Sequence, residues 1–206
     1  MRSSLRTLAI CLLAPAAVSL ASEGVPASLA TSQDRPSTAL GSSQDNPLIT
    51  HQKVIYGGMK KILLRAAESM PEENYGYKPT DTVRSFGQVI GHVADSQYMF
   101  CSIVRGEKNP APSIEKTKTS KADLIAALTD AFAYCDKAYD GMTDAAATQM
   151  VKLHGSEAPK LGVLTVIAVH SVEHYGNLVT YMRMKGIVPP TSDPEFMRGL
   201  APQPKK

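Results

Sequence analysis

The sequence predicts an all-α protein folded as an up-and-down antiparallel four-helix bundle. Four long stretches place apolar residues at helical spacing, and capping or helix-breaking residues bound most of them. No convincing strand pattern of alternating apolar and polar residues is visible. Helices of this length joined by modest loops are typical of an antiparallel bundle.

The first helix is expected to begin near Pro47, with Asn46 as its N-cap, and to end at Pro71. The segment from Pro71 to Asp81 then reads as a loop. The apolar positions of the helix follow a helical period, and they are Leu48, Ile55, Met59, Ile62, Leu63 and Ala66.

The second helix is expected from Ser85 to Arg105, with Gly106 among the residues that stop it. The third is expected from Ser120, a good N-cap residue, to about Tyr139.

The fourth helix is expected from about Pro159 to Lys185, with Gly186 as its C-terminal stop. The segment 142–158 is ambiguous and has room for one short helical turn. Four apolar residues of the fourth helix are expected to face the core, namely Val163, Val166, Ile167 and Leu178.

The ends of the chain are expected to lie outside the bundle domain, which we place at residues 46–192. Residues 1–21 have a basic start at Arg2 and Arg6, an apolar run and a small-residue cleavage site, which indicates a signal peptide. The alternative is an uncleaved anchor. Residues 22–45 have the composition of a flexible linker, and residues 193–206 form a tail. The mature protein is therefore expected to be periplasmic or secreted, without stable membrane association.

Charge and cysteine content narrow the functional classes. The formal net charge of +3 is too small to favour nucleic acid as a partner. Cys101 and Cys135 remain after signal cleavage, and two cysteines do not make a disulfide framework. Export permits a bridge between them, but buried free thiols are the preferred interpretation.

The histidines are the main candidates for chemistry. His170 and His174 are four residues apart in the last helix, so both imidazoles project from one helix face. His92 lies in the second helix, beside its apolar face. Helices can supply metal ligands at this spacing. The alternative is that these are core histidines satisfied by hydrogen bonds.

Three histidine ligands would leave at least one coordination position for water or substrate, as in catalytic metal sites. All-imidazole ligation suits Zn, Ni, Cu or Fe, and we expect Zn or Ni. Asp95 and Glu173 are candidates to orient the histidine rings. Asn177 and Tyr181 share the histidine face and are candidates for substrate contact. No nucleophile–base pair is visible, so the catalytic residues are unknown.

Three segments make the chain resemble the DinB-like (YfiT-type) four-helix-bundle superfamily over about residues 46–192. One is the loop from Tyr75 to Pro79. The other two are Arg84-Ser-Phe-Gly-Gln-Val-Ile-Gly-His92-Val-Ala-Asp95 and His170-Ser-Val-Glu-His174-Tyr-Gly-Asn. The resemblance implies a divalent metal held by one histidine of the second helix and an H-x-x-x-H pair of the last. In this chain these are His92, His170 and His174.

The resemblance also bears on function, because some family members are metal-dependent thiol transferases or isomerases and many have no assigned activity. Their thiol cofactors are mainly cytoplasmic, whereas this chain is expected to be exported. The leading hypothesis is therefore a metal-dependent transferase or hydrolase with an unknown small-molecule substrate. The alternative is a non-enzymatic module that binds a metal or ligand. A homodimer formed along helix faces is a further hypothesis.

Overall fold

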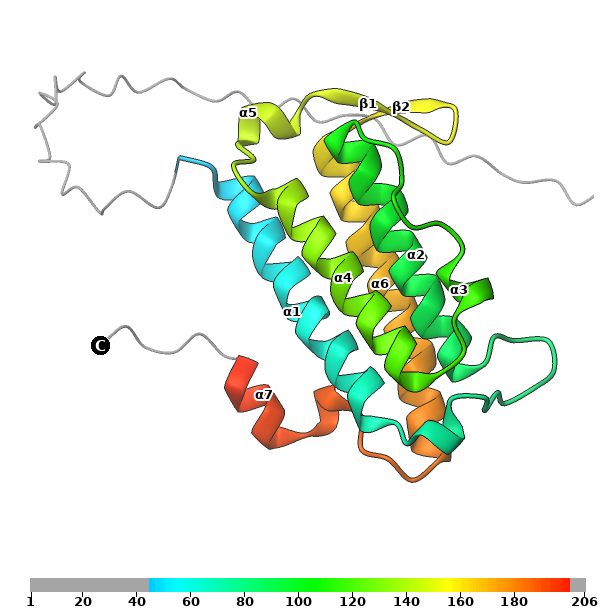
Figure 1. Ribbon diagram of the computed structural model, residues 1–206. Helices are drawn as coiled ribbons and strands as arrows, with labels where there is room; N and C mark the ends of the chain where they lie inside the picture. Colours follow the sequence, from blue (N-terminus) through cyan, green and yellow to red (C-terminus); the bar gives the residue numbers. More distant parts are fainter. Residues whose placement is uncertain (1–44, 201–206) are drawn as a thin grey trace, which may run out of the picture. The chain divides into compact units, whose positions relative to one another are not determined.

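Four long helices form the body of the protein in the computed structural model, which describes residues 45–200 (Figure 1). They are α1 (Pro47–Ser69), α2 (Phe86–Arg105), α4 (Lys121–Tyr139) and α6 (Lys160–Met184). The all-α bundle expected from the sequence is confirmed. The predicted signal peptide and nearly all of the predicted linker lie outside the described residues.

Shorter elements connect the long helices. They are the 3₁₀ turns η1 (Glu72–Asn74) and η2 (Pro190–Ser192), the helices α3 (Ile114–Thr117), α5 (Asp144–Ala147) and α7 (Pro194–Leu200), and the strands β1 (Met150–Leu153) and β2 (Ser156–Pro159).

The direction of the helices departs from simple alternation. The start of α4 lies at the end of α1, where Lys121 Nζ donates to the main-chain oxygen of Glu68. The start of α2 lies at the same end, where Gly87 N donates to Tyr75 O at 2.8 Å. Helices α2 and α4 therefore run in the same direction, opposite to α1 and α6 (Figure 1). The cause is the connection 106–120, which returns along α2 and carries α3.

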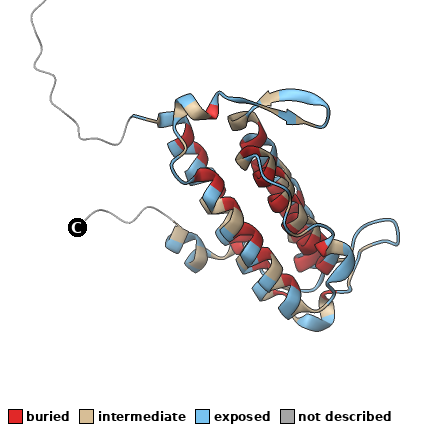
Figure 2. Cartoon of the chain, turned by 45° about the horizontal axis from the view of Figure 1, so that its top comes forward, coloured by how far each residue is buried: buried red, intermediate tan, exposed pale blue. Residues whose placement is uncertain are grey.

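The core lies between the inward faces of the long helices (Figure 2). The buried face of α1 begins with Ile49, Gln52 and Tyr56. Two residues of the predicted stripe point outward instead, since Leu48 is 56% and Ile55 40% exposed. The stripe was misassigned because polar Gln52 occupies a core position, where its amide donates to a main-chain oxygen of α6.

The helix ends are capped largely as expected. Ser85 and Gln88 form a capping box at the start of α2, and Gly106 ends this helix with a φ of +69°. The Asn46 side chain does not cap α1. The first amides of α1 instead donate to the carboxylate of Asp144, to which Leu48 N lies at 3.0 Å. A residue far away in sequence thus replaces the local cap.

Two features of the connections were not expected. Strands β1 and β2 pair antiparallel, with Met150 opposite Pro159 and a turn at Gly155. Four residues per strand are too few for a recognisable alternation. Helix α7 occupies most of the described part of the predicted tail. The short helical turn considered for segment 142–158 corresponds to α5.

Cys101 and Cys135 form a disulfide between α2 and α4. Both residues are fully buried, and their Cα atoms are 5.2 Å apart. The preference for free thiols is therefore wrong. Parallel helices bring the two cysteines to the same depth, and this juxtaposition depends on helix direction, which sequence spacing does not reveal.

One residue of α6 that was expected in the core lies on its outer surface instead. Val166, which was predicted to face the core, is 41% exposed, whereas Val163, Ile167 and Leu178 are buried. Valines therefore occur on both sides of the helix. Within residues 45–200, no helix combines the length and the apolar character that crossing a bilayer demands.

Candidate metal centre

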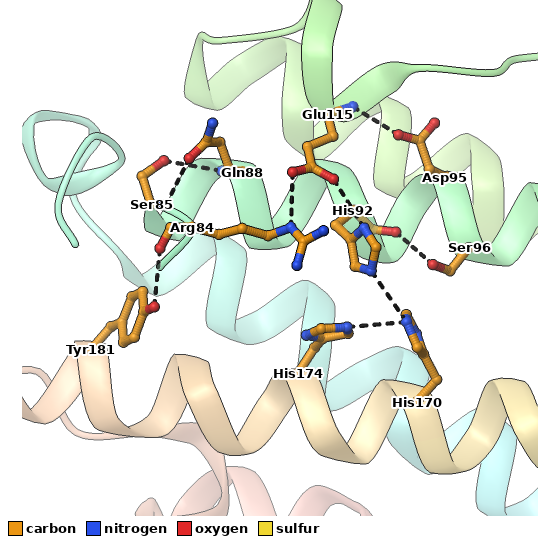
Figure 3. A network of polar contacts seen from close by, with 10 residues as sticks. All are labelled: Arg84, Ser85, Gln88, His92, Asp95, Ser96, Glu115, His170, His174 and Tyr181. Carbon is orange, nitrogen blue, oxygen red and sulfur yellow. Dashed lines mark hydrogen bonds and ion pairs between the residues drawn. The ribbon is translucent and has the colours of Figure 1, made fainter. Parts of the chain in front are cut away.

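Three histidines converge between the middle of α2 and the middle of α6 (Figure 3). His170 and His174 extend from successive turns of α6, and His92 points toward them from α2. The Nε2 atom of His170 lies 3.2 Å from His92 Nε2 and 3.0 Å from His174 Nε2. The structure thus brings together the three residues predicted as metal ligands.

The spacing of the nitrogens fits shared coordination. Metal–nitrogen bonds of about 2.0–2.1 Å at tetrahedral angles place two ligand nitrogens roughly 3.3 Å apart. Two of the three separations, 3.2 and 3.0 Å, are close to this value, and all three ligand atoms lie within 4.8 Å of one another. Small ring movements would suffice to bring the three lone pairs onto one cation.

A hydrogen-bonded trio accounts less well for this geometry. Glu115 Oε2 lies 2.9 Å from His92 Nδ1, so the neutral form of this ring has its proton on Nδ1 and a lone pair on Nε2. His170 Nε2, which contacts both other rings, has one proton or one lone pair when neutral. His170 Nε2 can therefore make a good hydrogen bond to only one of the two neighbouring rings. Its close contact with the other ring is then not a proper hydrogen bond. A cation accepts all three lone pairs at once.

Glu115 holds His92 in this orientation. One carboxylate oxygen accepts from His92, and the other accepts from Arg84 Nε at 2.8 Å. The carboxylate is thereby fixed from two sides. An acceptor on the outer ring nitrogen is what a ligating histidine requires to keep its tautomer and raise its basicity.

The position of Glu115 depends on how α3 docks on α2. The Asp95 carboxylate, proposed as a direct partner of a histidine, instead accepts from the main-chain amides of Ile114 and Glu115 at 2.7 and 2.9 Å. Gly91 provides the space, because a Cβ at this position would lie 2.7 Å from Glu115 Cα. Asp95 thus acts on His92 indirectly, by holding the main chain that carries Glu115.

Burial keeps two of the imidazoles neutral. Desolvation is the main cause that lowers the pKa of His170 to about 4, and the neighbouring imidazoles lower it further. The pKa of His174, which is 6% exposed, falls to about 4 mainly for the same reason, with His92 and Arg84 adding to the effect. Neutral imidazole is the form that binds metals.

The other predicted site residues lie around the trio in different roles. Glu173 and Asn177 are exposed and line a hollow beside His174. Tyr181 is buried at the same wall, where its hydroxyl donates to Arg84 O at 3.0 Å. Within the described chain, the Nδ1 atoms of His170 and His174 are buried without a hydrogen-bond partner.

A hollow of about 640 Å³ lies beside the trio, at the start of α2. His174 belongs to its wall, as do Arg84, Gln88, Asn177 and Tyr181. The protein supplies three nitrogens, so an ion held by them would have a coordination position that the protein leaves unfilled. The arrangement is suited to hold a divalent ion and to admit a small polar molecule beside it.

Sequence reasoning missed Glu115 and the role of Arg84. Residues 106–119 lie between the second and third expected helices, and no candidate site residue was sought there. The available signal was Ile114, an apolar residue within a polar stretch, which is 6% exposed and anchors α3 on the core.

Comparisons with known proteins agree with the fold. The chain is 24% identical over 150 residues to the uncharacterised protein YjoA of Bacillus subtilis. The matched region covers 69% of this chain and 92% of that protein. The crystal structure of YjoA superposes with a TM-score of 0.55 at 21% identity, over 68% of this chain and 92% of that one. The crystal structure of a DinB-like protein of Bacillus cereus superposes with a TM-score of 0.58 at 15% identity, over 69% of this chain and 93% of that one.

A third structure, a variant of the mycothiol-dependent maleylpyruvate isomerase, gives a TM-score of 0.50 at 16% identity and covers 67% of each chain. The family model of the DinB superfamily matches residues 58–178, a range that contains α2, α3 and all three histidines. Since this match spans more than half of the sequence, the chain belongs to the DinB superfamily.

Proposed function

We propose that this protein is a metal-dependent enzyme of transferase or hydrolase type, with a divalent ion held by His92, His170 and His174. The convergence of three Nε2 atoms beside an accessible hollow is the observation that carries the proposal. Zn or Ni is the expected ion, because imidazole nitrogens without a carboxylate favour borderline metals over Mg or Ca.

The bound ion would supply Lewis-acid chemistry, lowering the pKa of a water or thiol and so providing a nucleophile at neutral pH. The residues of the chain have separate tasks around it. Glu115 keeps the proton on His92 Nδ1 and leaves Nε2 free. Gln88, Asn177 and Tyr181 offer amide and hydroxyl groups along the hollow, where they would orient a polar substrate.

The nucleophile is a thiol or water. A protein of the same fold is named as mycothiol-dependent, which offers a precedent for a thiol, although fold likeness alone does not carry function. An exported protein would have less access to cytoplasmic thiols, and this favours water.

Metal content tests the ligand set. Purified protein, loaded with Zn or Ni, should retain about one equivalent after dialysis. His92→Ala and His174→Ala should lose it, while His51→Ala, at an exposed position of α1, should keep it. Circular dichroism would check that each variant is folded. Retention of the metal by both folded site variants would overturn the proposed centre.

Ligand uptake separates an enzyme from a binding module. Protein loaded with Co²⁺ should change its visible spectrum when azide or imidazole is added, because an open position accepts a fourth ligand. A loaded site that takes up neither would contradict an enzymatic role and favour storage or sensing.

We also propose that the mature protein is exported. The basic and apolar character of residues 1–21 motivates this, and the Cys101–Cys135 disulfide supports it, since such bonds persist mainly in oxidising compartments. Mass spectrometry of the protein from cell fractions should find an N-terminus at Ser22 outside the cytoplasm; a cytoplasmic protein that begins at residue 1 would contradict export.

A further inference from the structure

We propose that Lys116 and Lys118 bind an anionic arm, a carboxylate or a phosphate, of the organic substrate whose other end reaches the histidine trio. The proposal rests on the proposed function, because it assumes that substrate occupies the hollow beside the metal centre. It adds a second binding site and a substrate class: polar organic anions.

A second hollow adjoins the one at the trio. Its volume is about 670 Å³, and Lys78, Gln88 and Glu115 belong to the walls of both hollows. Glu115 thus stands between the metal centre on one side and the second hollow on the other. A molecule that extends past Gln88 would contact both spaces, and volumes of this size accommodate ordinary metabolites.

The second hollow is basic. Lys78, Lys116 and Lys118 line it, and Glu115 is the one carboxylate among its described lining residues. That carboxylate is already engaged by Arg84 and His92. The hollow therefore carries an excess of positive charge, although the whole protein has a net charge of only +3.

The neighbouring lysines differ in what they contact. Lys121 is used structurally, since its ammonium group donates to main-chain oxygens at the end of α1. Lys78 forms an ion pair with Asp81 at 3.3 Å. Lys116 and Lys118 form no ion pair or side-chain hydrogen bond with any residue in the described range, and both line the hollow. They are the cations available to a ligand.

Other groups along the path indicate a polar rather than an apolar substrate. Ser85, Gln88 and Thr119 line the basic hollow, and Asn177 and Tyr181 line the hollow at the trio. Amide and hydroxyl groups fix the orientation of polar ligands. The two lysines would in addition favour a negative charge on the end of the substrate that lies away from the metal.

Bifunctional probes test this arm. N-alkylimidazoles of increasing chain length, each ending in a hydroxyl, a carboxylate or a phosphate, would be titrated into Co²⁺-loaded protein. The imidazole binds the metal and is read from the visible spectrum. At the length that spans the two hollows, the anionic probes should bind about tenfold more tightly than the alcohol, because only the anions can form ion pairs with the two exposed lysines. The carboxylate and phosphate series show which anion fits.

A matched pair of variants assigns the effect. In Lys116→Gln/Lys118→Gln the preference for the anionic probes should fall to about twofold or less. Lys53→Gln/Lys152→Gln removes the same charge from exposed positions outside both hollows and should keep the preference. Equal binding of anionic and neutral probes by the wild type would overturn the proposal, as would a preference that survives in the first variant.

The outcomes separate the two proposals. If metal loads and the alcohol probes bind without any advantage for the anions, the anionic arm fails and the metal centre stands. If no metal loads, or no probe binds the loaded protein, the proposed function fails, and the arm fails with it.

Discussion

Helix α2 meets two different environments on its two sides. Toward α4 it presents closely packed apolar side chains and Cys101, which is bonded to Cys135. Toward α6 it presents polar groups: His92 meets His170, and the amide of buried Gln97 donates to a serine hydroxyl. One helix therefore packs against a disulfide-bonded apolar core on its α4 side and carries the polar groups of the candidate metal centre on its α6 side.

The difference shows how stability and chemistry are divided within the bundle. Unpaired buried polar atoms cost about 1–3 kcal/mol each, and such atoms occur at His170 and His174. The α4 side of the helix, with its disulfide, is placed to offset that cost. His92 and Cys101 are separated by nine residues, or about 13.5 Å along the helix axis, so changes at one should leave the other largely undisturbed.

The largest effect is expected from removing the disulfide. Cys101→Ala/Cys135→Ala opens a covalent loop with a sequence separation of 34, and the lost constraint on the unfolded chain should lower the free energy of unfolding by roughly 4 kcal/mol. Urea denaturation of oxidised protein and variant would measure it. Metal content should not change.

The cysteine variant also tests whether the two sides of α2 are independent. A folded variant that loses its metal would show that the α4 side positions the histidines. A free energy of unfolding equal to that of the wild type would show that the bond contributes no stability.

The architecture of the bundle was largely predictable from sequence. Breaking and capping residues such as Ser85 and Gly106 mark the ends of α2 to within one residue. Helix direction was not predictable, because it depends on the path of the connection 106–120. The disulfide follows from that direction, so Cys101 and Cys135 could not be paired from sequence.

The candidate site was predictable where its residues stand out on a helix face. The i,i+4 spacing placed His170 and His174 on one face, His92 was a candidate from its place beside the apolar face of the second helix, and the family resemblance assigned all three as ligands. Glu115 was missed because its contact with His92 arises from the docking of α3, not from a periodic pattern. Asp95 was noticed, yet its partners are main-chain amides of α3, which helical geometry within α2 does not show.

A smaller effect is expected at Gly91, where the connection approaches α2. Gly91→Ala places a Cβ against the Glu115 main chain, and overpacking of this kind costs about 1–3 kcal/mol. Because α3 must shift, Glu115 should also retreat from His92, and metal affinity should fall together with the free energy of unfolding. Urea denaturation and competition with a chromophoric chelator would measure the two quantities.

Gly58→Ala in α1 is the matched control. The added methyl meets open space within the described structure, so the change should stabilise the protein by about 0.5–1 kcal/mol through helix propensity. The same substitution is thus expected to have opposite signs at two helical positions. A neutral Gly91→Ala variant would contradict the close approach of α3.

The smallest effect is expected from a substitution of Glu115 itself. Glu115→Gln preserves shape but replaces a charged acceptor with a neutral amide, so His92 loses much of the interaction that holds its tautomer. Removal of such partners weakens metal binding by roughly tenfold or more, or about 1.4 kcal/mol. Chelator competition would measure the affinity, with Glu157→Gln on exposed β2 as the charge-matched control.

The result at Glu115 distinguishes two roles of α3. If Glu115 acts on the metal centre, Glu115→Gln weakens metal binding while the free energy of unfolding stays near that of the wild type, because Asp95 still anchors the main chain of α3. If the carboxylate merely ties α3 to Arg84, the variant unfolds more easily and binds metal as the wild type does. The second outcome would show that His92 is oriented by its rotamer alone. The metal centre would then consist of the three histidines without Glu115.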